Sequence, residues 1–321
     1  VIVCFNTLSQ SSSLVLYFTK FDLMIYKLMV KDFSSQNETI SICDSIVRQY
    51  KNHPETELII DFDGCEFIYP DYAVLFICTI KYLERIGYKV VGQILINRES
   101  KTANYLAEMN FFEVLKAEFP FQVNIIDDKS SVQIQRYTKE NQLEVLNSIL
   151  KVLREKSSMH DNVYTSLDYC LNEILDNVLN HSEEEEGWVV AQYYENLNSI
   201  RLIVADYGIG IQKSLNIKHN FTEEESLLKC IEEGVSNGKG QGHGLYATST
   251  FVKLNKGFLS VCSGNKKLNI TENNLTLKSI KKWNGTYVYL RINTNVDVDY
   301  TEFTSKHYDY KKHLFESMFD N

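Results

Sequence analysis

Over residues 24–115, short apolar runs alternate with segments whose apolar residues recur at helical spacing. This alternation limits the fold more than any other feature. Pro, Gly and Asp bound the runs, as expected where strands meet turns. The pattern predicts strands at Met24–Phe33, Leu58–Phe62 and Lys89–Ile94, and helices at Asn37–Lys51, Tyr72–Ile86 and Lys101–Met109. Strands that alternate with helices predict a small α/β sheet covered by helices.

The chain has 321 residues, which exceeds the size at which one hydrophobic core usually stops growing. A charged, Ser-containing segment at residues 127–131 is typical of a domain boundary. We therefore expect one domain at 24–126 and a second at 131–294. Residues 1–23 lack the basic start of a signal peptide and are predicted to be a leader or a segment of open role, and residues 295–321 a C-terminal tail.

The second half has a different order of elements. Helical spacing predicts three helices, and apolar runs predict four strands, with a long irregular stretch after the second strand. The predicted helices are Lys139–Glu155, Asn162–His181 and one that begins at Leu245, and the predicted strands are Trp188–Tyr194, Ile200–Asp206, Gly257–Cys262 and Thr286–Ile292. The acidic run Glu183–Glu186 is predicted to be a solvated loop.

The composition and net charge of the chain limit the class of protein and the kinds of partner that it can bind. Hydrophobic residues make up 44% of the chain and the formal net charge is -9, which favours an ordinary globular protein and excludes a broad surface for nucleic acid or anionic membrane. No apolar run reaches the roughly 20 residues that a membrane-spanning helix needs. The 7 cysteines are scattered without metal-ligand spacing, so we expect reduced thiols and a cytoplasmic protein.

A row of polar residues follows the predicted helix at 162–181. Glu173, Asn177 and His181 are spaced four apart, so all three project from one side of the helix, next to an apolar stripe. A carboxylate can orient an attacking oxygen, and an amide oxygen is a ligand suited to Mg2+. Taken alone, the row is equally compatible with a polar outer face.

Two glycine-containing segments follow. Asp206 ends an apolar strand and precedes Gly208 and Gly210, which let the backbone approach a flat base while the carboxylate accepts the exocyclic amine of adenine. A simple turn is the alternative.

The second segment, at 238–245, enters an apolar helix, where backbone N–H groups and the helix N-terminus favour phosphate oxygens. A glycine-rich helix cap is the alternative, and no Gly-Lys-Ser or Gly-Lys-Thr makes it a Walker A loop. Thr286, after Asn284 and Gly285, opens the last predicted strand, and its hydroxyl is predicted to form a hydrogen bond at the adenine end; an ordinary strand start is the alternative. The candidate ligands in the second segment are Gly240, Gly242, His243, Gly244 and Leu245.

In this order, the four elements resemble the GHKL ATPases (gyrase, heat-shock chaperone, histidine kinase, MutL), and most closely the anti-sigma-factor serine kinases. The resemblance covers 131–293 and implies ATP and Mg2+ as cofactors. It implies that Glu173 is the catalytic base, Asn177 holds Mg2+, Asp206 binds adenine and residues 242–245 contact phosphates. It also implies a two-layer α/β sandwich (Bergerat fold) with a mixed sheet, and an ATP lid at 212–241.

The first half, 24–126, resembles STAS domains (sulfate transporter and anti-sigma antagonist), on the residues 58–71 and the helix after them. Regulatory STAS domains usually carry a phosphorylatable serine where this chain has Tyr69-Pro70-Asp71-Tyr72. We therefore expect a docking or autoinhibitory module, with Asp71 as a plain helix N-cap.

Three functions remain open. The resemblance implies a kinase or partner-switching regulator that acts on a regulatory protein of STAS or sigma-factor type. An ATPase switch of the gyrase and chaperone kind, and a non-catalytic nucleotide sensor in a regulatory or defence assembly, are the alternatives. A homodimer is open in each case, and no nucleic-acid or membrane partner is expected.

Overall fold

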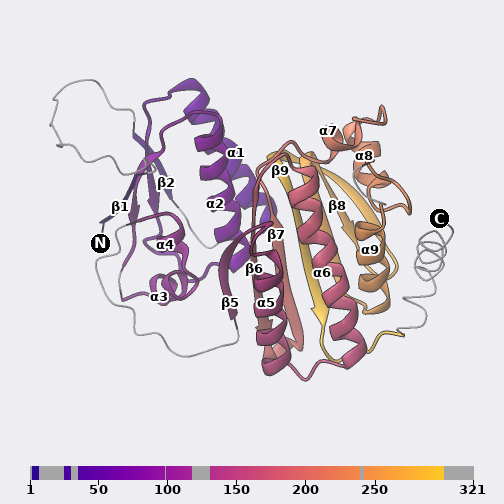
Figure 1. Ribbon diagram of the computed structural model, residues 1–321. Helices are drawn as coiled ribbons and strands as arrows, with labels where there is room; N and C mark the ends of the chain where they lie inside the picture. Colours follow the sequence, from indigo (N-terminus) through magenta and orange to yellow (C-terminus); the bar gives the residue numbers. More distant parts are fainter. Residues whose placement is uncertain are drawn as a thin grey trace. The chain divides into compact units, whose positions relative to one another are not determined.

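The computed structural model describes residues 2–6, 25–29, 35–97, 99–117, 131–238 and 242–299 (Figure 1). The chain divides into two compact units, Val1–Asp128 with Ile280–Asn284 and Lys129–Ser279 with Gly285–Asn321. Residues 7–24 of the predicted leader and strand, and 300–321 of the predicted tail, lie outside the described residues.

A four-stranded sheet forms the centre of the first unit. Its order is β1-β4-β3-β2, in which β2 (Ile25–Met29), β3 (Glu57–Asp61) and β4 (Val91–Leu95) are parallel. The strand β1 (Ile2–Asn6) pairs antiparallel with β4, although the sequence predicted no strand there. The predicted strand–helix alternation is confirmed in this unit.

The helices of the first unit begin at recognisable signals. In α1 (Gln36–Asn52), the N-cap Ser35 accepts a hydrogen bond from Glu38 N at 3.3 Å. In α2 (Pro70–Arg85), Pro70 occupies the first turn, where its missing N–H costs nothing. The N-cap there is Tyr69, so the predicted capping role of Asp71 is wrong; its carboxylate instead accepts a hydrogen bond from Gln36 Nε2 at 3.1 Å. Two short helices follow, α3 (Lys101–Glu108) and α4 (Phe111–Val114).

A five-stranded sheet forms one layer of the second unit. Its order is β5-β6-β7-β9-β8, and the ladders β5–β6, β6–β7 and β7–β9 are antiparallel. None of these three ladders is parallel, so the predicted mixed sheet is not observed. The strands are β5 (Ser131–Thr138), β6 (Glu186–Tyr194), β7 (Ser199–Ala205), β8 (Phe258–Ile270) and β9 (Leu275–Asn293).

Three helices form the other layer: α5 (Gln142–Lys156), α6 (Asp161–His181) and α9 (Gly244–Leu254). Figure 1 shows them side by side over one face of this sheet. Their apolar stripes and alternate strand residues share one core, because side chains on a strand alternate between its two faces. That core includes Leu167, Leu171, Ile174, Val178, Val189, Leu202, Phe251 and Leu290.

Several elements of the second unit were not predicted. The strand β5 was not predicted, because the charged segment before it was interpreted as a loop at the domain boundary. Two short helices, α7 (Ile211–Leu215) and α8 (Glu223–Lys229), lie in the stretch predicted to be irregular. The strands β8 and β9 extend well beyond their predicted ends, through polar residues that carry no clear alternation.

Among the helices of the described residues, none combines the length and apolar character needed to cross a membrane. The cysteines with described side chains are free thiols, and all but the half-buried Cys230 are buried.

A buried amide joins the end of α9 to the end of β9. Asn255 is fully buried, and its Oδ1 accepts from Asn293 N at 2.7 Å. Its Nδ2 donates to Asn293 O at 2.8 Å and to Val296 O at 2.9 Å. One side chain thus pairs with three backbone groups and fixes the C-terminal end of the helix whose first residue is Gly244.

We expect Asn255→Ala to lower the free energy of unfolding by about 3 kcal/mol, because three backbone groups lose their partner. Urea denaturation of the full chain measures this. Asn273→Ala, at an exposed asparagine of the β8–β9 turn, is the control and should change little. Equal stability of the two variants would contradict the role of Asn255.

Candidate functional site

The predicted polar row lies on α6. Glu173, Asn177 and His181 are each half-buried, while the apolar stripe of the same helix is in the core. His181 is the last residue of the helix, and Ser182 is its C-cap. The row therefore faces away from the core without being fully exposed, as a binding surface requires.

The start of α9 lies directly against this row. A Cβ atom added at Gly244 would be 2.9 Å from Glu173 Oε2 and 3.0 Å from Asn177 Nδ2. The Glu173 and Asn177 side chains would have to shift to admit a Cβ, so glycine lets the start of α9 lie against the polar row with these side chains in place. The structure thus brings Glu173, Asn177 and Gly244 together, although Gly244 is far from the other two in sequence.

Asp206 organises a second part of the site. Its carboxylate is buried, and Oδ1 accepts from Gly208 N at 2.8 Å and from Thr286 N at 3.1 Å. Asp206 N in turn donates to Thr286 O at 2.8 Å. Thr286 was predicted to act through its hydroxyl, but these contacts use its backbone. Asp206, Gly208 and Thr286 therefore form one cluster.

The two glycines after Asp206 approach protein atoms. A side chain at Gly208 would overlap the carbonyl of Ser182, and Ile209 N donates to that carbonyl at 2.9 Å. Gly210 has φ +80°, a conformation that favours glycine. Gly208 thus has a structural role that the sequence did not predict, because it allows the loop to pack on the end of α6, immediately after His181. Approach of the backbone to a flat base stays a prediction.

The glycine-rich segment folds back on the residues before it. Gly242 has φ +74°, and a Cβ there would be 2.5 Å from Val235 O. Gly234 N donates to Gly242 O at 3.1 Å. His243 is the N-cap of α9, and Leu245 packs against the core. Gly240 lies outside the described residues.

Much of the predicted lid is held by protein contacts. A capping box of Thr222 and Glu225 starts α8, Glu223 Oε1 accepts from Asn265 N at 2.9 Å, and Lys266 pairs with Glu224 at 3.0 Å. These bonds attach α8 to β8. The stretch 212–241 is therefore not irregular throughout, because it includes most of α7 and all of α8, while its role as a lid stays a prediction.

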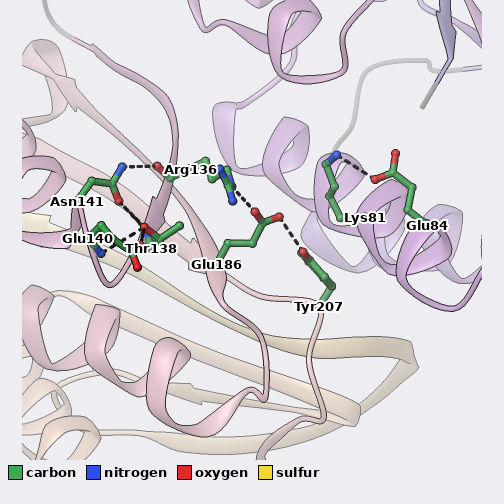
Figure 2. Close-up of polar contacts among 8 residues, drawn as sticks. All are labelled: Lys81, Glu84, Arg136, Thr138, Glu140, Asn141, Glu186 and Tyr207. Atoms are coloured by element: carbon green, nitrogen blue, oxygen red, sulfur yellow. Dashed lines mark hydrogen bonds and ion pairs between the residues drawn. The ribbon is translucent and has the colours of Figure 1, made fainter. Parts of the chain in front are cut away.

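Figure 2 shows polar contacts that link Arg136, Glu186 and Tyr207, the residue after Asp206 in sequence. Arg136 forms an ion pair with Glu186, and Glu186 Oε1 accepts from the Tyr207 hydroxyl at 2.7 Å. The side chain of Glu186 is only 15% exposed. The solvated loop predicted for the acidic run is therefore wrong at Glu186, which lies in β6 and anchors the residue after Asp206.

Burial, and then the nearby Asp176 carboxylate, raises the pKa of Glu173 above the usual glutamate range. Asp176 itself accepts a hydrogen bond from Gln142 Nε2 at 2.9 Å. A carboxyl group with a raised pKa in a half-buried position is suited to accept a proton.

The side chains at the candidate site can be compared with those that a metal ion needs. In the described part of the chain, no group of three His, Cys, Asp or Glu side chains is placed to hold one. Mg2+ often takes only one or two protein ligands, with phosphate oxygens and water completing its shell. The single amide of Asn177, beside the glycine contact at Gly244, fits that arrangement.

Comparison with known families agrees with this geometry. Residues 162–295 match the family described as histidine kinase-, DNA gyrase B- and HSP90-like ATPase, HATPase_c. No curated protein matches the chain. The match begins in α6 and ends after β9, so it contains Glu173, Asp206, Gly244 and Thr286. The match supports a GHKL-type (HATPase_c) domain over residues 162–295.

We expect Glu173→Gln to raise the free energy of unfolding at pH 7. A group whose pKa is raised by folding contributes stability that is present below its unfolded pKa and is lost as pH rises through its folded pKa. Ionised Glu173 therefore weakens the fold at neutral pH, and a neutral amide removes this cost.

Urea denaturation of the full chain at several pH values measures the effect. The advantage of the variant should shrink as pH falls toward about 4, where the carboxyl group also becomes neutral. Glu195→Gln, at an exposed glutamate, is the control. A variant no more stable than wild type at pH 7 would refute the electrostatic argument.

Proposed function

We propose that the chain binds Mg-ATP in the site formed by α6, α9 and the Asp206 cluster, and that it transfers the terminal phosphate to a partner protein. The observation that most supports this is the contact of Gly244 with Glu173 and Asn177. It places a carboxylate, an amide and a helix N-terminus at one point, which is the set of groups that a magnesium-bound phosphate needs.

Each group has a distinct role in the proposal. Glu173 orients or deprotonates the attacking oxygen, because its raised pKa suits proton transfer. Asn177 is the ligand for Mg2+, which neutralises phosphate charge when bound. Asp206 recognises the exocyclic amine of adenine from a position fixed by Gly208 N and Thr286 N. Gly242 to Leu245 contact phosphate oxygens.

The partner in this proposal is a regulatory protein of STAS or sigma-factor type. It is supported by the resemblance of the motif order to anti-sigma-factor serine kinases. The first unit lacks the usual serine at Tyr69-Pro70-Asp71, so it serves as a docking or autoinhibitory module. The proposed setting is the cytoplasm.

We expect wild-type protein to bind ATP in calorimetry, and to bind it more tightly with Mg2+. Glu173→Gln should keep this affinity but lose turnover by about a hundredfold or more, because it removes the proton acceptor. Asn177→Ala should lose most of the gain that Mg2+ gives. Asn180→Ala, at an exposed asparagine of the same helix, is the control for Asn177→Ala. Unchanged turnover in Glu173→Gln would refute the catalytic assignment.

A second experiment identifies the phosphate acceptor. We expect γ-labelled ATP to label serine or threonine of a STAS-type partner with wild-type protein and not with Glu173→Gln. Release of inorganic phosphate without labelled partner would favour an ATPase switch. Tight binding without any turnover would favour a nucleotide sensor, and either result would remove the kinase proposal.

A further inference from the structure

A buried serine outside every predicted motif joins two parts of the candidate site. Ser263 lies on β8 and is 4% exposed. Its hydroxyl accepts a hydrogen bond from Ile211 N at 2.9 Å and donates one to Gly285 O at 3.0 Å. A hydroxyl group can do both at once, because it has one donor and two acceptor positions.

The backbone around this hydroxyl is shaped to admit it. A Cβ atom added at Gly210 would be 2.7 Å from Ser263 Oγ and 3.3 Å from Gly285 O. Gly285, with φ +109°, is equally tight, because a Cβ there would overlap the backbone of Asp206 and Tyr207. Three backbone segments therefore meet around one side chain, and two of them approach so closely only because they carry glycine.

The two hydrogen bonds of the Ser263 hydroxyl lie beside the hydrogen bonds that fix the Asp206 carboxylate. The carboxylate is held by one N–H from its own loop, Gly208, and one from the last strand, Thr286. Ser263 binds the same loop at Ile211 and the same strand at Gly285. The two sets of hydrogen bonds act in parallel, so the position of the Asp206 carboxylate depends on both.

We propose that Ser263 is a positioning residue for the base of the nucleotide, which it serves by holding the 206–211 loop against residues 285–286 of β9. This inference rests on the proposed function, because it assigns Asp206 to the base. Ser263 acts on the base end of the site and not on the magnesium end. Its loss should therefore weaken ATP and ADP equally, with or without Mg2+.

Calorimetry on the full chain tests this with Ser263→Ala. We expect the Kd for ATP and for ADP to rise about tenfold each, because two hydrogen bonds that preorganise the loop are lost. The KM for ATP should rise by a similar factor, while kcat stays within about twofold because the transferred phosphate is untouched. The ratio of affinities with and without Mg2+ should not change.

Two further variants keep the test decisive. Ser260→Ala is the matched control, since Ser260 is a buried serine of the same strand whose hydroxyl makes no hydrogen bond within the described residues. It should bind nucleotide as wild type does. Ser263→Thr keeps a hydroxyl group, so its affinity for nucleotide should stay within about threefold of wild type. This variant tests the role of the hydroxyl if Ser263→Ala does not fold.

The outcomes separate the two proposals. If wild-type protein binds no adenine nucleotide, the proposed function fails and the role of Ser263 fails with it. If wild type binds and Ser263→Ala binds equally well, only the role of Ser263 is refuted. Equal losses in the Ala and Thr variants, or a loss confined to Mg-ATP, would also refute it.

Discussion

The contact between Gly244 and the polar face of α6 is the constraint on which the rest of the site depends. A Cβ at Gly244 would force the Glu173 or Asn177 side chain to shift, so glycine lets the start of α9 lie against the polar row with both side chains in place. That approach places the first N–H groups of α9, which have no partner within the helix, beside a carboxylate and an amide. The other end of α9 is fixed by Asn255, whose three hydrogen bonds join it to the end of β9. The helix is therefore held at both ends, once by close packing and once by a buried amide.

The base end of the candidate site follows a different principle. There the backbone, rather than side-chain packing, sets the geometry: Asp206 binds two N–H groups, and Ser182, Ser263 and Gly285 contribute the atoms that keep the loop in place. Gly208 and Gly210 are needed because protein atoms already fill the space that side chains would occupy. Tyr207 adds a bond to Glu186, which in turn pairs with Arg136. Elements from β5, β6, α6, β8 and β9 thus converge on one loop.

Sequence patterns predicted the parts of this arrangement that depend on local geometry. Glu173 and Asn177 could be placed on one helix face because residues four apart lie on the same side. The match of 162–295 to an ATPase family supports the same segment, whereas the STAS-like reading of 24–126 stays a prediction. Ser263 and Glu186 could not be predicted, because their partners are distant in sequence and neither residue has a local signature. The helix α8 did have one, since Thr222 and Glu225 have the spacing of a capping box.

In the proposed function, the ionised form of Glu173 serves chemistry at a cost in stability. A carboxylate that is partly removed from water and close to Asp176 is held at an unfavourable position in its charged form, which is why its pKa is raised. Folding alone gives no reason to keep it there, because a neutral amide of nearly the same shape would fit the same space. The free-energy cost of the half-buried carboxylate is offset by the apolar packing of α6, whose residues Leu167, Leu171 and Ile174 lie in the core. An electrostatically unfavourable group on a well-packed helix is therefore better explained by chemistry at the α6–α9 contact than by the needs of the fold.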